Sequence, residues 1–184
     1  MAAQKGSSER MTIRAARTVG KDRRSVQING GRKVTRREAR EHCFKMLFCQ
    51  DFYPAEEKEE QLERYFEAPK EDVTGEDGKD EILHDPFEKE EDRYYLEKRV
   101  EKIMELIPEI DEKINEIAEG WRTRRMGKVE LTILRLAVFE MKYDEEIPEK
   151  VAINEAVELA KKFGGDEAPA FVNGILAKLI QKGN

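Results

Sequence analysis

The chain has 184 residues, of which 39% are hydrophobic and 40% are charged, and its formal net charge is −6 at pH 7. This length is enough for one domain with a sizeable core, and no segment approaches the ~20 consecutive apolar residues of a transmembrane helix. The basic N-terminus lacks the apolar segment of a secretory signal. Two cysteines, Cys43 and Cys49, exclude a disulfide framework and indicate free thiols in a reducing compartment. We therefore expect a soluble, cytoplasmic protein with no membrane association.

Charge is distributed unevenly along the chain. Residues 1–34 carry a net charge of +7, and residues 51–92 carry −13. The first segment has few large apolar residues and cannot bury enough surface to offset its ordering entropy, which predicts a disordered basic extension. Prolines, glycines and acidic residues over residues 67–85 predict a solvated acidic loop. The folded domain is expected to cover residues 35–184.

The remaining pattern is helical, and no alternating strand pattern stands out. Thr35 and Glu38 have the spacing of a capping box, which predicts that a helix begins there. Residues 128–143 are apolar nearly all round, which is typical of a buried central helix. Pro108 is expected to separate two helices. The fold class is therefore expected to be all-α, a compact bundle of about seven helices, which cover approximately residues 35–53, 55–66, 86–107, 110–117, 128–143, 148–163 and 167–179.

Sequence motifs for metal binding, for phosphate-binding loops and for nucleophilic catalysis are absent from the sequence. His42 and His84 have no Cys or His at the spacing of metal ligands. The glycine-rich phosphate loops and the serine nucleophile motif are also missing. Cys43 beside His42 does not form a nucleophile pair, because neighbouring side chains on a helix point about 100° apart. The sequence predicts no enzyme, no catalytic residue, no cofactor and no metal site.

A basic cluster opens the first predicted helix. Arg36 and Arg37 lie in the first turn, where the helix dipole is already positive and a cation costs roughly 0.3–1 kcal/mol. Arg40 lies on the same face as Arg36, so the three guanidinium groups form a patch suited to phosphate oxygens. The alternative is that Glu38, Glu41 and the acidic middle of the chain neutralise the patch.

A second cluster precedes the buried helix. Arg122, Arg124, Arg125 and Lys128 follow Trp121, and guanidinium and indole planes can stack on the bases of single-stranded RNA. These four cations are candidate RNA contacts. The alternative is that the cations are merely solvated, and for Trp121 itself we expect a core position. Phe48 lies off the main apolar stripe of its helix and could be exposed, although a core role is again expected.

Three segments resemble the NusB family of bacterial transcription antitermination factors. They are RREARE at residues 36–41, WRTRRMGKVELTILRLAVFEMKY at residues 121–143, and IPEKVAINEAVELAKKFGGDEAPAFVNGILAKL at residues 147–179. The combination of VAINEAVELAK and FVNG is highly specific to NusB and NusB-like domains. The resemblance covers roughly residues 35–180.

The resemblance implies two packed helical sub-bundles and a role in transcription antitermination. Family members bind the boxA element of ribosomal RNA leader transcripts as a heterodimer with the ribosomal protein NusE. The complex joins other Nus factors and RNA polymerase on ribosomal RNA operons. By similarity, Arg36, Arg37, Arg40 and Phe48 contact RNA. The residues carried over more weakly, as partner-binding or RNA-modulating, are Glu130, Phe163, Gly164, Asp166 and Glu167.

Two other functions are considered. One is a helical interaction module that uses its acidic middle to hold a basic partner and has no RNA role. The other is the NusB-like domain of a ribosomal RNA methyltransferase, which would need a following catalytic domain with a glycine-rich cofactor loop that this sequence lacks. The resemblance leaves open a monomer or a homodimer. It also predicts that Asn154 and Asn173 are buried or capping amides.

Overall fold

A computed structural model describes residues 34–183 of the chain, except 69–70, 75–79, 85–89 and 119. The chain divides into two units, Met1–Gly30 and Gly31–Asn184. All described residues belong to the second unit. The basic extension expected over residues 1–34 therefore lies outside the described residues, except for Val34. The predicted helix start at Pro86 lies outside them as well.

Six α-helices dominate the described residues, so the all-α class is confirmed. The elements in chain order are α1 (Arg36–Gln50), a 3₁₀ helix (Ala55–Glu57), α2 (Lys58–Glu67), β1 (Glu71–Thr74), β2 (Asp80–His84), α3 (Glu90–Ile117), a 3₁₀ helix (Thr123–Arg125), α4 (Lys128–Tyr143), α5 (Glu149–Phe163) and α6 (Ala168–Gly183).

The expected count of seven helices was wrong because α3 continues through Pro108. Proline inside a helix removes one backbone hydrogen bond and usually kinks or ends the helix. Here the buried residues Val100 and Ile103 before the proline, and Ile110 and Ile114 after it, anchor both halves in the core. Tertiary packing therefore overrides the local preference for a break.

The acidic segment at residues 67–85 contains a short hairpin that the sequence did not predict. Strands β1 and β2 pair antiparallel, with Thr74 opposite Asp80 and an irregularity between Glu71 and Asp72. Acidic residues interrupt the apolar alternation that identifies a strand, so the pattern did not reveal the pairing.

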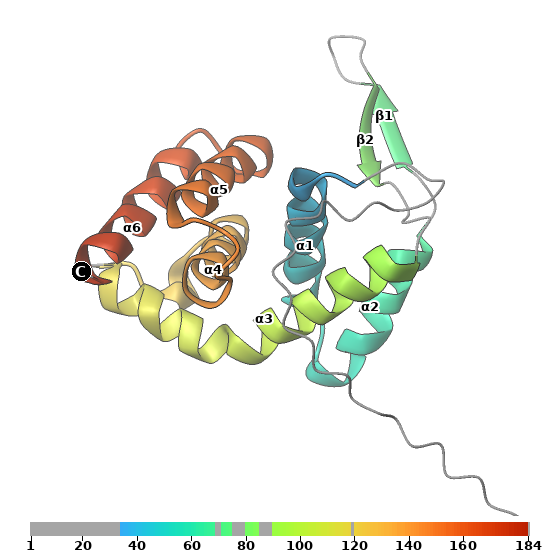
Figure 1. The fold of residues 1–184 in the computed structure, drawn as a ribbon, viewed down its shortest axis with the longest axis horizontal. Coiled ribbons are helices and arrows are strands. Elements are labelled where there is room, and N and C mark those ends of the chain that lie inside the picture. Colours follow the sequence, from blue (N-terminus) through green and yellow to red (C-terminus); the bar gives the residue numbers. More distant parts are fainter. Residues whose placement is uncertain (1–33, 69–70, 75–79, 85–89, 119, 184) are drawn as a thin grey trace, which may run out of the picture. The chain divides into compact units, whose positions relative to one another are not determined.

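The helices pack in two groups that share α3. Helix α1 contacts α2, α3 and α4, whereas α4, α5 and α6 contact one another, and α3 also contacts α6. Figure 1 shows α3 running below α1 and below the group of α4, α5 and α6 in this view. This arrangement agrees with the two sub-bundles that the family resemblance implied.

The core is centred on α4, as its pattern predicted. Ile133, Leu134, Leu136 and Val138 are 0–1% exposed. Polar residues on α4 are buried too, and one of them, Glu140, is central to the site described below. Within the described part of the chain, no helix combines the length and apolar character that a membrane span requires.

The two cysteines are free and differ in environment. Cys43 is buried in the core, whereas Cys49 is exposed. Burial raises the pKa of the Cys43 thiol to about 12, so almost no thiolate is present at neutral pH. We expect a thiol reagent such as Ellman's to modify Cys49 in the folded protein and to reach Cys43 only after denaturation. Rapid reaction of two thiols per folded chain would contradict this burial.

Candidate nucleic-acid interface

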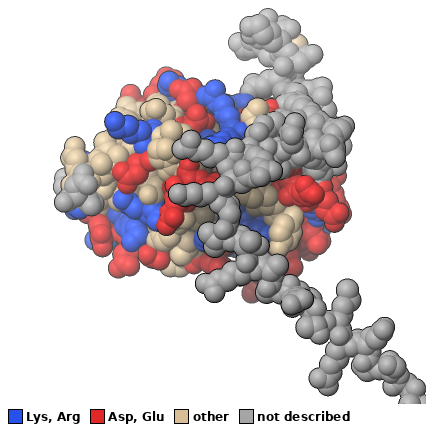
Figure 2. All heavy atoms as spheres, viewed as in Figure 1, with Lys and Arg blue, Asp and Glu red and all other residues tan. Residues whose placement is uncertain are grey.

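Charges of both signs lie side by side on the face of the described residues that Figure 2 draws. Figure 2 shows Lys and Arg atoms interspersed with Asp and Glu atoms on the face in view. Net charge therefore does not locate an interface. The local pairing of each cation decides which of them are available to a ligand.

Helix α1 begins with the capping box that the sequence predicted. The Thr35 side chain accepts a hydrogen bond from the Glu38 backbone at 3.2 Å, and the Glu38 carboxylate accepts one from the Thr35 backbone at 2.8 Å. Arg36 and Arg37 lie in the first turn behind this cap, and both are exposed. The cap therefore holds two guanidinium groups at the positive end of the helix dipole.

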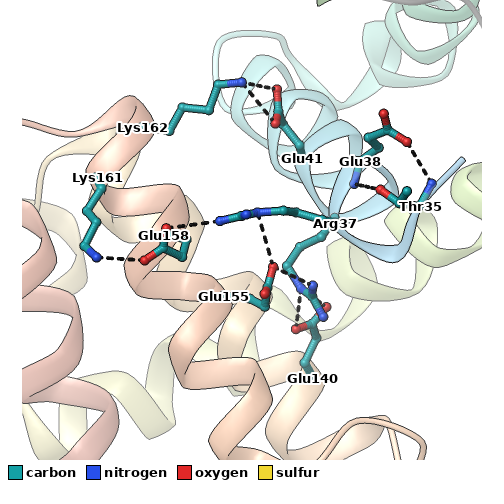
Figure 3. A network of polar contacts seen from close by, with 10 residues as sticks. Thr35, Arg37, Glu38, Glu41, Glu140, Glu155, Glu158, Lys161 and Lys162 are labelled. Carbon is teal, nitrogen blue, oxygen red and sulfur yellow. Dashed lines mark hydrogen bonds and ion pairs between the residues drawn. The ribbon is translucent and has the colours of Figure 1, made fainter.

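Arg37 extends from α1 toward α5. Its guanidinium donates to Glu158 at 3.1 Å and lies 3.9 Å from a Glu155 oxygen, as Figure 3 shows. The Arg37 side chain is nevertheless 63% exposed. It therefore remains accessible to an anion from solvent, because exposed ion pairs are weak and exchange readily with other anions.

Arg40 is buried, whereas the sequence predicted that it belongs to a surface patch with Arg36 and Arg37. Its side chain is only 8% exposed, and its Nε donates to both Glu140 oxygens at 2.9 Å. Its Nη1 donates to Glu155 at 3.2 Å. The structure brings Arg36 and Arg37 to the surface of α1, and it places Arg40 beneath them in the packing between helices.

Glu140 is the centre of this buried network. It is 1% exposed and also accepts a hydrogen bond at 3.0 Å from Arg99 on α3. Arg99 in turn donates to Asp144 at 2.6 Å. Burial disfavours the charge of Arg99, but this hydrogen bond and the nearby charge of Glu140 act together against burial, and the pKa of Arg99 lies above its ordinary value. One carboxylate thereby connects α1, α3 and α4.

A cleft of about 460 Å³ lies between α1 and α5. Lys162 on α5 donates to Glu41 on α1 at 3.1 Å, and Lys161 donates to Glu158 at 2.7 Å. We call this feature the α1–α5 cleft, and its lining residues are Arg37, Arg40, Glu41, Glu155, Glu158, Leu159, Lys161 and Lys162.

Two carboxylates of the cleft, those of Glu41 and Glu158, are held in the ionised state. Burial acts to raise the pKa of Glu41, but hydrogen bonds from Lys45 and Lys162 outweigh it and the net pKa is lowered. The hydrogen bond from Lys161, together with Arg37, lowers the pKa of Glu158. At neutral pH the cleft therefore presents cations that are already paired with carboxylates, and an entering phosphate must compete with them.

Four phenylalanine rings form a row that runs from the end of α5 along α1 to the turn after it. The rings of Phe44 and Phe163 stack at 4.7 Å, those of Phe44 and Phe48 stack at 6.0 Å, and Phe52 meets Phe48 edge-on at 5.1 Å. We call this row the aromatic ladder. Phe48 and Phe163 are half-buried, so the core role expected for Phe48 is combined with an accessible edge.

The second predicted cluster is exposed. Trp121 is 54% exposed, so the expectation that it belongs to the core was wrong. Its indole packs edge-on against Phe171 at 5.6 Å, and a positive φ of 79° at Gly120 turns the chain before it. The side chains that follow it and are also exposed are Arg122, Arg124, Arg125 and Lys128.

Lys128 links this second cluster to the end of α1. Its ammonium donates to Asp51 at 3.0 Å, and Asp51 also accepts a 3.0 Å hydrogen bond from Arg135. Arg135 forms a bidentate pair with Asp111 at 2.8 Å for both bonds. This chain of ion pairs connects the C-terminus of α1 with α4 and α3.

The residues to which the family resemblance gave a weaker, partner-binding or RNA-modulating role lie at two helix junctions. Gly127 leaves room for the Glu130 carboxylate at the start of α4, because a Cβ there would collide with it. Gly164 ends α5, and a Cβ at this position would meet the Ala160 carbonyl oxygen at 2.8 Å. Asp166 and Glu167 are exposed in the turn that follows. The amides Asn154 and Asn173 are exposed inside α5 and α6, so the prediction that they are buried or capping amides was wrong.

Sequence reasoning missed the carboxylates that face the cleft. Glu155 and Glu158 belong to the VAINEAVELAK segment, and their partners on α1 are more than a hundred positions away. Among the described residues, no three His, Cys, Asp or Glu side chains are grouped as a metal site would require.

Comparison with known proteins identifies the family. The NusB family profile matches residues 37–181. The transcription antitermination protein NusB of Lachnoclostridium phytofermentans is 48% identical over 147 residues, which cover 80% of this chain and 99% of that protein.

Solved structures agree with this match. A NusB structure from T. maritima has a TM-score of 0.64 and 30% identity, and the match covers 82% of this chain and 94% of that one. A crystal structure of antitermination factors NusB and NusE in complex with dsRNA has a TM-score of 0.58 and 25% identity, over 80% of this chain and 96% of that one. A profile match over most of the sequence and a relative at 48% identity show that this chain belongs to the NusB family.

Proposed function

We propose that this chain is a transcription antitermination factor that binds the boxA element of ribosomal RNA leader transcripts together with NusE. The complex joins other Nus factors and RNA polymerase and promotes processive transcription of ribosomal RNA operons. The chain acts by binding rather than by catalysis, and it acts in the cytoplasm. Its relative from L. phytofermentans is named a transcription antitermination protein, and a similar structure contains NusE and RNA.

The exposed arginines at the start of α1 carry the proposal. Arg36 and Arg37 are exposed cations in the first turn of a helix, where they oppose the dipole and contribute little to folding. Phosphate groups would compensate this local cost, and guanidinium groups bind phosphate in a planar, two-pronged geometry. We assign these two arginines to direct RNA contact and Arg40 to holding α1 against α4. Phe48, Arg122, Arg124, Arg125 and Lys128 extend the proposed surface.

Fluorescence anisotropy with two RNAs of equal length, one boxA-type and one scrambled, tests the proposal. Each RNA is titrated across a salt series with and without purified NusE. Preference for boxA that NusE strengthens supports the proposal. Equal binding to both RNAs with a steep salt dependence would indicate phosphate attraction alone. No RNA binding even with NusE present would leave a helical interaction module as the better description.

Substitution of Glu158 by glutamine is expected to tighten RNA binding several-fold at low salt. The substitution removes a carboxylate that pairs with Arg37 and Lys161, so both cations become available to phosphate. Anisotropy at two salt concentrations measures the change, which salt should reduce. The matched control is Glu105→Gln, an exposed carboxylate on α3. An equal gain in both variants would mean that net charge, rather than the cleft, controls affinity.

A further inference from the structure

Phe52 is an exposed aromatic residue with an ordered support. It lies in the turn directly after α1, and 60% of its surface is exposed. A single exposed apolar side chain needs no explanation. Phe52, however, is the outer end of the aromatic ladder, so its ring is backed by Phe48 and, through Phe44, by Phe163.

The ladder follows one face of α1. Phe44, Phe48 and Phe52 are spaced four residues apart, and residues at this spacing are neighbours on a helix surface. Arg37 and Glu41 continue the same face toward the N-terminus and line the α1–α5 cleft. With a rise of 1.5 Å per residue, the face from Arg37 to Phe52 is roughly 22 Å long. Cleft and ladder thus lie along the same face of α1, with the buried ring of Phe44 between them.

Cations lie at both ends of the ladder. At its inner end, the ammonium groups of Lys45 and Lys162 lie 5.9 Å and 5.5 Å from the centroid of the Phe163 ring. At its outer end, Lys128 pairs with Asp51, the residue before Phe52. Surfaces that bind single-stranded nucleic acid combine these two elements, a positively charged track for the backbone and aromatic side chains for the bases.

We infer that Phe52, supported by Phe48, stacks on a base of single-stranded RNA whose backbone follows the α1–α5 cleft. The inference rests on the proposed function and adds to it a base contact beyond the basic first turn of α1. It also joins the two basic clusters, because the RNA that reaches Phe52 arrives beside Lys128.

Anisotropy with the full chain and a boxA-type RNA compares Phe52→Ala with Phe52→Tyr, which keeps a stacking ring. We expect about tenfold weaker binding for Phe52→Ala, since base–aromatic stacking is typically worth a factor of this size, and near wild-type binding for Phe52→Tyr. The matched control is Tyr94→Ala on α3, because Tyr94 is 61% exposed and lies outside the ladder. Circular dichroism verifies that each variant is folded.

A second measurement locates the stacked base. The fluorescent base 2-aminopurine replaces one RNA position at a time, and stacking quenches its emission. We expect quenching at a particular position with wild-type protein, loss of that quenching with Phe52→Ala, and an unchanged salt dependence of affinity because the phosphate contacts remain.

Retention of wild-type affinity and quenching by Phe52→Ala would overturn the inference while leaving the proposed function intact. An equal reduction of affinity in Tyr94→Ala would also overturn it. If Phe52→Ala weakens only the binding of NusE, the ladder is a protein contact and the inference is wrong. If the wild-type chain binds no RNA, both the proposed function and the inference are wrong.

Discussion

Glu140→Ala is expected to lower the free energy of unfolding by about 3–5 kcal/mol, the usual cost of removing one partner of a buried ion pair. The substitution leaves Arg40 and Arg99 in the core without the carboxylate that lies between them. Each guanidinium keeps one other acid, Glu155 or Asp144, but both of these lie nearer the surface than Glu140. Urea unfolding followed by circular dichroism measures the difference.

Glu101→Ala is the control for this prediction. Glu101 pairs with Lys98 at 2.5 Å on the exposed side of α3, and exposed pairs contribute little to stability. We expect its unfolding curve to overlay that of the wild type. If Glu140→Ala also unfolds like the wild type, the buried network does not hold α1 against α3 and α4, and the positioning role assigned to Arg40 is wrong.

Charge reversal of both exposed arginines, Arg36→Glu with Arg37→Glu, is expected to weaken RNA binding at least tenfold. The change removes the two cations that we assign to phosphate contact and would place carboxylates beside the RNA backbone. The slope of log affinity against log salt concentration should become shallower by about 0.7 for each phosphate that is no longer neutralised, the value for single-stranded nucleic acid. Anisotropy across a salt series measures both quantities.

The free energy of unfolding of this double variant should not fall below that of the wild type by a measurable amount. Acidic residues in the first turn favour a helix because they complement its dipole. This gain opposes the loss of the exposed Arg37–Glu158 ion pair, which contributes little to stability, so the unfolding curve should stay close to that of the wild type. Lys98→Glu with Lys102→Glu on α3 makes the same change in net charge away from the cleft. Similar reductions of RNA affinity in both double variants would show that total charge, and not the start of α1, governs binding.

Local sequence signals predicted much of the fold. The Thr35 and Glu38 spacing located the start of α1, and the all-round apolar pattern identified α4 as the central helix. Both signals depend on residues close in sequence. Pro108 misled the prediction, since a local rule gives no weight to the core contacts that keep α3 continuous.

The site was predictable only in part, because its decisive contacts are distant in sequence. The basic first turn was evident, but Arg40 meets Glu140 across a separation of 100 residues, and nothing local marks one arginine as buried and its neighbours as exposed. Arg40 was expected at the surface and is buried, whereas Trp121 was expected in the core and is exposed. Its large apolar ring favours a core position on average, yet it packs edge-on against Phe171 with much of its surface exposed.

Terminator read-through in a purified transcription system is the direct measure of antitermination by this chain. The template carries boxA or a scrambled boxA upstream of a terminator, and RNA polymerase, NusE and the other Nus factors are supplied with and without this chain. We expect the chain to raise read-through on the boxA template only, and Arg36→Glu with Arg37→Glu to abolish the gain. Read-through that is unchanged by the chain, or equal on both templates, would contradict it.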